Sequence, residues 1–286
     1  MFLLHEKHIP RKRFGQHFLT NEHIADRIVE CADIGSEAIV LEIGPGKGIL
    51  TERILKQASD VFAIEIDHDL VKMLQVRFGH IKGFHLIEAD ILSLDLEGLL
   101  KDFHQRIKVV ANIPYNISSP IIELFIRNRG LISRAVIMVQ KEVARRLLAR
   151  PGTKDYGLAT LNLALCAEGS RIMDVKPGSF YPTPEVMSSV ISLVFSKQYR
   201  YPLENEEFFR LITGVVFRQR RKMLRNTLIP FLTAKGISEW KIKDLLISSG
   251  IDIRLRPESL DVGDFVRMSN ILVKTLSHKN GLEYLP

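Results

Sequence analysis

The stretch LEIGPGKG, residues 41–48, decides the fold, because its three alternating glycines join a strand-like run to the start of a helix. Glycine lets the backbone turn tightly and approach a ligand without intervening side chains. The stretch lacks the G-x-x-x-x-G-K-[ST] spacing of a phosphate-binding loop, and it departs from the dinucleotide fingerprint because Gly48 and Ile49 fill the last two positions. It therefore predicts a nucleotide-type pocket, with a glycine turn that binds no ligand as the alternative.

Strand-like and helical segments alternate on both sides of this turn. Several strand-like runs are apolar almost throughout, which is typical of parallel strands covered on both faces. Amphipathic helical stretches lie between them at 50–58, 68–78 and 120–128. This alternation predicts a doubly wound α/β fold, with a Rossmann-like sheet of seven strands. The predicted strands cover residues 38–43, 60–66, 83–88, 107–111, 135–139, 171–175 and 189–195.

The strand signals stop beyond residue 196, where residues 199–205 form a polar linker that contains proline. We therefore expect a cofactor-binding α/β domain at 1–197 and a small all-helical domain at 198–286. Trp240 lies at the polar–apolar border of a helix and is expected in the core rather than as a platform for stacked bases. The predicted helices of the second domain cover 206–217, 221–229, 238–248 and 257–276.

The composition restricts the classes of protein to which the chain can belong. A hydrophobic fraction of 46% and a charged fraction of 26% describe a globular chain, and no stretch reaches the roughly 20 apolar residues of a membrane span. Two cysteines, Cys31 and Cys166, exclude a disulfide framework and a cysteine-based zinc site. We therefore expect a soluble cytoplasmic protein with no membrane partner and no bound metal. The net charge of +7 and the isoelectric point near 9.4 favour anionic partners.

Two carboxylates follow successive strands of the predicted sheet. Glu65 ends the second strand, 21 residues after Gly44, and a carboxylate there can accept hydrogen bonds from both ribose hydroxyls of a nucleoside. Asp90 follows the third strand and is placed to accept from an adenine amino group. NAD and S-adenosylmethionine would both use these groups, whereas either carboxylate alone is compatible with a surface charge or a helix cap. Their shared position at the carboxyl ends of successive strands favours a nucleoside-binding cleft.

The segment ANIPYNISSP, residues 111–120, follows directly after the fourth predicted strand. An asparagine with a proline and an aromatic residue after it suits one task, which is to hold a planar amine. The Asn112 side-chain oxygen and the Ile113 carbonyl can each accept one N6 proton of an adenine. Pro114 stiffens the turn, and Tyr115 can stack on the ring. Such a corner would promote methyl transfer through positioning and charge stabilisation, and the alternative is an ordinary proline turn.

A second aromatic loop, SFYPTPEV at residues 179–186, precedes the last predicted strand. Its alternating prolines impose an extended and rigid path. Phe180 is therefore expected against the open face of a base that is already stacked on Tyr115. A purely structural connector is the alternative.

Together, these segments resemble the KsgA family of ribosomal-RNA small-subunit adenine dimethyltransferases, which is related to the Erm enzymes. The resemblance extends from Arg11 to about Asn270, nearly the full length. It departs from the family pattern at Met187, where the family usually has aspartate. The motifs that carry it are FGQHFL (14–19), EIGPGKGILT (42–51), EID (65–67), NIPYNISS (112–119) and FYPTPEV (180–186).

The resemblance implies a class I methyltransferase fold and S-adenosylmethionine as the cofactor. It also implies which residues surround the cofactor and the target adenine. His17 and Leu19 are assigned to the cofactor site through the resemblance alone. The residues expected around the target adenine are Asn112, Ile113, Pro114, Tyr115 and Phe180. The residues expected to contact the cofactor are His17, Leu19, Gly44, Gly46, Glu65, Asp90 and Asn112.

A basic stretch marks the predicted helical domain. Residues 210–226 contain six basic side chains and no acidic one, and residues 198–286 carry a net charge of +5. If one helix continued through this stretch, four basic side chains would share a face and could follow an RNA phosphate backbone, although a solvated basic face is the alternative. The segments FRQRRKMLRN (217–226) and RPESL (256–260) also resemble the small-subunit branch of the family rather than Erm. The four candidate RNA-binding residues are Arg218, Arg221, Lys222 and Arg225.

The expected activity is transfer of methyl groups from S-adenosylmethionine to N6 of two adjacent adenosines near the 3′ end of small-subunit rRNA. The expected partner is this rRNA within the immature 30S particle, and we expect the enzyme to act as a monomer. A checkpoint factor of ribosome assembly with secondary catalysis is one alternative. An Erm-type enzyme that methylates large-subunit rRNA is another, and a nicotinamide oxidoreductase is a remote third.

Overall fold

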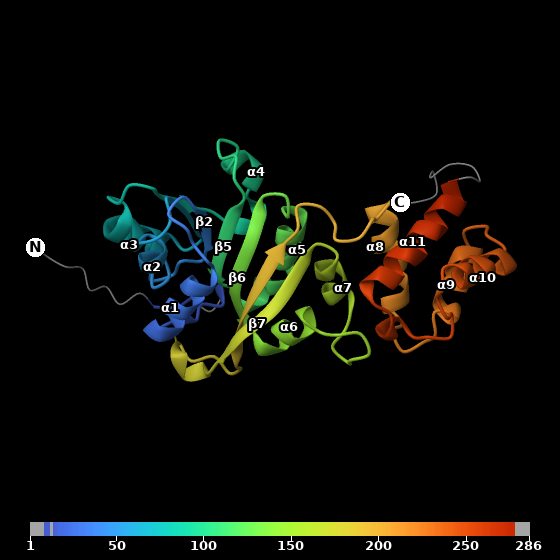
Figure 1. Cartoon of the computed structure of the whole chain (residues 1–286). Helices are drawn as coiled ribbons and strands as arrows, with labels where there is room; N and C mark the ends of the chain where they lie inside the picture. Colours follow the sequence, from blue (N-terminus) through green and yellow to red (C-terminus); the bar gives the residue numbers. More distant parts are fainter. Residues whose placement is uncertain (1–8, 12–13, 278–286) are drawn as a thin grey trace, which may run out of the picture. The chain divides into compact units, whose positions relative to one another are not determined.

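The computed structural model of the chain describes residues 9–11 and 14–277 (Figure 1). The chain forms two compact units. The first unit comprises the described residues up to Arg145 together with Cys166–Gln198. The second unit comprises Arg146–Leu165 together with the described residues from Tyr199 onward. Across the described ranges, no helix is both long and apolar enough to cross a membrane.

A seven-stranded sheet forms the centre of the first unit, in the order β4-β3-β2-β5-β6-β9-β7 (Figure 1). All seven strands predicted from the sequence are present, so the α/β fold class is confirmed. Every residue of β2 is buried, as expected for a central strand covered on both faces. The strands are β2 (Ile39–Ile43), β3 (Asp60–Glu65), β4 (Phe84–Glu88), β5 (Ile107–Asn112), β6 (Ile132–Gln140), β7 (Ala167–Val175) and β9 (Ser188–Phe195).

The last strand departs from the parallel arrangement expected for the sheet. Strands β4, β3, β2, β5 and β6 pair in parallel, but β9 pairs antiparallel with both β6 and β7. Only residues 176–187 connect β7 to β9. A short return of this kind produces an antiparallel neighbour, whereas a parallel pair needs a longer crossover connection.

A separate two-stranded sheet was not predicted from the sequence. It pairs β1 (Phe18–Leu19) with β8 (Phe180–Tyr181) antiparallel, with Leu19 opposite Phe180. The pairing brings the N-terminal segment next to the FYPTPEV loop. Because side chains alternate along a strand, Phe180 is buried while Tyr181 is 58% exposed.

Helices of the first unit pack apolar residues against the large sheet. Helix α1 contributes Ala25 and Ile28 to a core that also contains Val40, Val110 and Val136 from the central strands. Asp67 caps α3 by accepting from the Asp69 amide, so this helix begins directly after the carboxyl end of β3. The helices are α1 (Glu22–Cys31), α2 (Thr51–Ile54), α3 (His68–Phe78), α4 (Leu96–Leu99), α5 (Ser118–Arg127) and α6 (Lys141–Leu147), which leads into the second unit.

The second unit is entirely helical in its described part, and it begins earlier in the chain than the expected boundary at residue 197. Residues Arg146–Leu165 belong to it because Tyr156, Leu161 and Leu165 join the same apolar core as Phe208. The sequence prediction had placed this segment in the α/β domain. The helices are α7 (Leu158–Ala164), α8 (Glu206–Phe217), α9 (Arg225–Thr233), α10 (Glu239–Ser248) and α11 (Val262–Ser277).

The basic stretch does not continue α8 as one helix. Helix α8 ends at Phe217 and α9 begins at Arg225, so the four candidate RNA-binding residues do not share one helical face. Leu224 is fully buried, and its amide donates to the Leu255 carbonyl at 2.9 Å. This packing fixes the break between the helices. All four candidate side chains are nevertheless exposed. The expectation for Trp240 was wrong, since its side chain is 75% exposed.

Candidate active site

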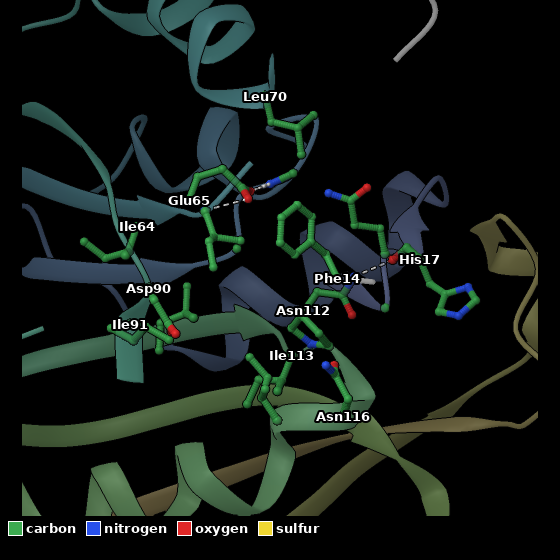
Figure 2. A pocket seen from close by; sticks show the side chains of 18 of the residues that line it. Phe14, His17, Ile64, Glu65, Leu70, Asp90, Ile91, Asn112, Ile113 and Asn116 are labelled. Atoms are coloured by element: carbon green, nitrogen blue, oxygen red, sulfur yellow. Dashed lines mark hydrogen bonds between the residues drawn. The ribbon is translucent and has the colours of Figure 1, made fainter. Parts of the chain in front are cut away.

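A cleft of about 280 Å³ lies at the carboxyl edge of the large sheet (Figure 2). Parallel strands end at the same edge, so the residues that follow β2, β3, β4 and β5 meet there. The cleft is lined by most of the residues that the sequence singled out. The predicted residues that line it are His17, Gly44, Gly46, Glu65, Asp90, Asn112, Ile113, Pro114 and Tyr115.

The glycine turn after β2 needs glycine for both conformation and space. Gly46 has a φ of 59°, and a Cβ at this position would lie 3.0 Å from the Phe18 ring. Gly48 has a φ of 80°, and a Cβ there would lie 2.5 Å from the Phe78 ring. Other residues would therefore strain the backbone and displace the packed aromatic rings.

Glu65 is the buried acceptor at the end of β3. Its Oε2 accepts from the Gly46 amide at 3.1 Å, and its Oε1 accepts from the Ile66 and Asp67 amides at 2.9 and 3.0 Å. Burial raises the pKa of this carboxyl, and the three amides oppose the rise. Since Oε2 accepts only the Gly46 amide among these groups, it retains a lone pair for a ligand hydroxyl.

Asp90 follows β4 and combines two roles. Its Oδ1 accepts from the Leu92 amide at 2.9 Å, so it caps the 3₁₀ turn at residues 91–93. The residue is exposed and also lines the cleft (Figure 2). A helix cap and a ligand acceptor are therefore compatible at this position.

Asn112 is held in one orientation by the N-terminal segment. Its Nδ2 donates to the His17 carbonyl at 2.9 Å. This bond fixes the side-chain amide, so Oδ1 is the atom that remains as an acceptor. In Figure 2 Asn112 and Glu65 lie at different sides of the cleft. The adjacent Ile113 amide donates to the Met138 carbonyl at 3.1 Å, which anchors the corner to β6.

Tyr115 is fixed at both its hydroxyl and its ring. The hydroxyl forms a hydrogen bond of 2.7 Å with the Ser188 hydroxyl, and burial raises the pKa of the phenol. The His17 imidazole stacks on the ring at a centroid distance of 5.4 Å. One ring face is thus covered, and a base can stack only on the opposite face.

His17 acts through its backbone and its packing. Its Nδ1 lies 2.8 Å from the Pro182 carbonyl, and in Figure 2 the imidazole points away from the centre of the cleft. The geometry makes His17 a positioning residue for Asn112 and Tyr115.

The structure does not bring Leu19 and Phe180 into the cleft. They are paired in the small sheet and are only 5% and 4% exposed, respectively. Both belong to the apolar core that α1 forms with the central strands. The expected stacking of Phe180 on a base is therefore corrected: strand alternation turns this ring inward and leaves the neighbouring Tyr181 exposed.

An N-terminal strap crosses the cleft, and residue reasoning alone did not predict it. We define the strap as the described residues 11 and 14–17. Gln16 Nε2 donates to Asp67 Oδ2 at 2.8 Å, and the Arg11 guanidinium lies 3.4 Å from Asp67 Oδ1. Phe14 places its ring in the cleft (Figure 2). The FGQHFL and EID motifs, quoted for their resemblance, signalled Phe14, Gln16 and Asp67, whereas Arg11 lies outside both motifs.

Glu42 is a second buried carboxyl beneath the glycine turn. Burial raises its pKa to about 8, the nearby Glu65 adds to the rise, and Thr51 offsets part of it. The unfolded carboxyl has the lower pKa, so the folded chain binds the extra proton between about pH 4.5 and pH 8. The free energy of unfolding should therefore fall as the pH rises through this window.

Glu42→Gln should remove this loss of stability. Above pH 8 we expect the free energy of unfolding of the variant to exceed that of the natural chain by at least about 1 kcal/mol. The variant should therefore unfold at a higher temperature. Thermal unfolding of both proteins across the pH window measures the difference. Equal pH dependence in the two proteins would contradict the assignment of a protonated Glu42.

The sheet, with β9 antiparallel between β6 and β7, and the glycine-lined cleft at its carboxyl edge define a class I S-adenosylmethionine-dependent methyltransferase. The sequence profile of the family described as ribosomal RNA adenine dimethylase matches residues 7–274. The chain belongs to this family. The expected enzyme class and its cofactor, S-adenosylmethionine, are thereby confirmed.

Curated relatives and solved structures agree with this assignment. A ribosomal RNA small subunit methyltransferase A from Desulfotalea psychrophila is 37% identical and covers 94% of this chain and 93% of the relative. The protein of the same name from Geobacter metallireducens is 39% identical, with coverages of 92% and 95%. A dimethyladenosine transferase from Plasmodium falciparum is 28% identical with a TM-score of 0.77, covering 91% of this chain and 98% of that one. The 23S rRNA methyltransferase ErmE shares the fold, with a TM-score of 0.68 and 23% identity. The match covers 90% of this chain and 99% of ErmE.

Proposed function

We propose that the chain dimethylates N6 of two adjacent adenosines near the 3′ end of small-subunit rRNA. The observation that carries the proposal is the fixed orientation of Asn112, whose Oδ1 is left as an acceptor at the edge of the glycine cleft. The names of the curated relatives favour the small subunit as the substrate. The resemblance of residues 217–226 and 256–260 to the same branch supports this choice over an Erm-type substrate.

The residues of the cleft fit S-adenosylmethionine. Glu65 Oε2 would accept from the ribose hydroxyls, and Asp90 would accept from the adenine amino group. Ile66, which is 44% exposed in the cleft, would cover part of the adenine ring. The open glycine turn would leave space for the remainder of the cofactor. When bound, the cofactor supplies an activated methyl group for transfer to a nucleophile.

The corner at residues 112–115 would present that nucleophile. Asn112 Oδ1 and the Ile113 carbonyl would each accept one N6 proton of the target adenine, and Tyr115 would support the ring. Two acceptors favour a pyramidal nitrogen and aim its lone pair, so the rate gain would come from positioning and charge stabilisation. After the first transfer the nitrogen keeps one proton, and one of the two bonds still holds it for the second.

The exposed basic residues of the second unit would bind the rRNA backbone. Arg221 and Lys222 form no ion pair or side-chain hydrogen bond with any residue in the described part of the chain. The double variant Arg221→Gln and Lys222→Gln should bind unmethylated small subunits more weakly. It should also flatten the salt dependence by up to about two units of log–log slope, as filter binding over a salt series would measure. An unchanged slope would count against this surface.

Mapping of incorporated methyl groups tests the proposed substrate. Unmethylated small subunits, large subunits and free rRNA are incubated separately with the protein and labelled S-adenosylmethionine, and the modified positions are then located. We expect label only in small-subunit rRNA, as two adjacent dimethyladenosines near the 3′ end. Label in large-subunit rRNA would favour the Erm-type alternative, and absence of label in every RNA would contradict the proposal.

We further propose that a single copy of the chain acts in the cytoplasm on the immature 30S particle. The basic character of the second unit supports contact with an RNA-rich particle. A role as an assembly checkpoint is compatible with catalysis in the same protein. Maturation assays with the Asn112→Ala protein separate the two roles, because a checkpoint persists when methyl transfer is lost.

A further inference from the structure

A second cavity lies within the helical unit, and none of the residues that line the cofactor cleft lines it. It has a volume of about 410 Å³ and opens between α8 and α9. This volume lies in the range of sites that hold small molecules. The lining residues are Arg210, Leu211, Gly214, Val215, Arg218, Gln219, Thr227 and Phe231.

Gly214 is the residue of this cavity that the fold does not explain. It lies in the middle of α8, where glycine is less favourable than alanine because it loses more backbone freedom on folding. Its φ is not positive, and a Cβ at this position would meet no atom within 4 Å. Neither conformation nor packing within the described chain requires glycine here. A side chain larger than alanine at this position would enter the cavity.

The walls of the cavity combine apolar surface with positive charge. Phe231 on α9 and Leu211 and Val215 on α8 supply the apolar part. Arg210 and Arg218 supply two guanidinium groups, and no acidic side chain lines the cavity. Arg210 Nε donates to the Glu206 carboxylate at 2.9 Å, which holds its side chain at the helix surface. Arg218 is exposed and forms no ion pair with any residue in the ranges that the structure covers.

This chemistry matches one unpaired nucleotide of RNA. A base stacks on an aromatic ring at the same time as its phosphate pairs with arginine, and both contacts are tolerant of the base identity. We propose that the α8–α9 cavity binds a single unpaired nucleotide of the rRNA substrate, with its base against Phe231 and its phosphate at Arg218. The inference rests on the proposed function, and it adds a subsite that recognises unpaired RNA separately from the target adenine.

A pair of substitutions at one position tests the cavity. Gly214→Leu fills it, whereas Gly214→Ala adds one methyl group in open space and serves as the matched control. The full-length proteins are titrated with a short fluorescein-labelled single-stranded oligoribonucleotide and with a duplex RNA of the same length. We expect Gly214→Leu to bind the single strand about tenfold more weakly, with duplex binding unchanged, because only the unpaired base is expelled. Gly214→Ala should bind both RNAs like the natural chain and unfold at a higher temperature.

Two further measurements keep the test decisive. Arg218→Gln changes an exposed side chain, so it leaves the fold intact, and it should weaken single-strand binding and lower the salt slope by about one unit. A 5-iodouridine in the oligoribonucleotide should crosslink to the peptide that contains Phe231. Unchanged single-strand binding by Gly214→Leu, equal losses for both RNAs, or crosslinks only outside α8 and α9 would each overturn the proposal. These experiments measure RNA binding and crosslinking rather than methyl transfer. They therefore test the cavity even if the proposed methylation target is wrong.

Discussion

Asn112→Ala should lower the rate of methyl transfer by about a thousandfold while leaving much of the affinity for S-adenosylmethionine. The Oδ1 acceptor is the group that aims the adenine N6, and loss of one such positioned group costs about 10²–10³ in rate. The Nδ2 bond to the His17 carbonyl is lost as well, which loosens the strap above the cleft. The cofactor retains Glu65, Asp90 and the glycine turn as its binding groups.

Single-turnover transfer to small subunits and calorimetric titration with the cofactor measure the two effects separately. Asn128→Ala is the matched control, because Asn128 also donates through its side-chain amide, to the Leu124 carbonyl, but lies outside the cleft. It should transfer methyl groups at the natural rate. Full activity in Asn112→Ala would remove Asn112 from the chemistry, and loss of activity in both variants would indicate a general effect on the fold.

Glu65→Ala should weaken the binding of S-adenosylmethionine by about a hundredfold, or about 3 kcal/mol, because hydrogen bonds to a charged acceptor contribute about 1.5–3 kcal/mol each. The same carboxylate accepts hydrogen bonds from the amides of Gly46, Ile66 and Asp67, so its loss also leaves these donors unpaired. Calorimetry with S-adenosylhomocysteine measures the change without turnover.

Glu88→Ala is the matched control for Glu65→Ala. Glu88 lies directly opposite Glu65 in the register of β3 and β4, and it also ends its strand. It pairs with His68 and does not line the cleft, so its removal should leave cofactor binding unchanged. Equal affinity in the Glu65→Ala protein and the natural chain would show that the ribose site lies elsewhere.

Apolar periodicity was enough to predict the large sheet. Strands β2, β3, β5, β6 and β9 are mostly buried apolar runs, whereas β4 and β7 are more exposed. The carboxylates that end β3 and follow β4 were placed correctly at one edge. The direction of β9 could not be predicted from its composition. Its antiparallel pairing depends on the length of its connection to β7.

The remaining differences depend on contacts between distant residues. The basic stretch favours a helix locally, but burial of Leu224 and its bond to Leu255 break that helix. In the two-residue strand β8, a shift of one position exchanges buried and exposed side chains, so sequence alone could not assign Phe180 inward and Tyr181 outward. The contacts of Gln16 and Arg11 with Asp67 join segments more than fifty positions apart, and no local pattern encodes them.

A crystal structure of the chain with S-adenosylhomocysteine and adenosine bound would test the central claim most directly. We predict the ribose hydroxyls of the cofactor product at the Glu65 carboxylate and the N6 atom of adenosine within hydrogen-bond distance of Asn112 Oδ1. An adenosine whose N6 faces away from Asn112, or a cofactor product seated outside the glycine cleft, would contradict the account.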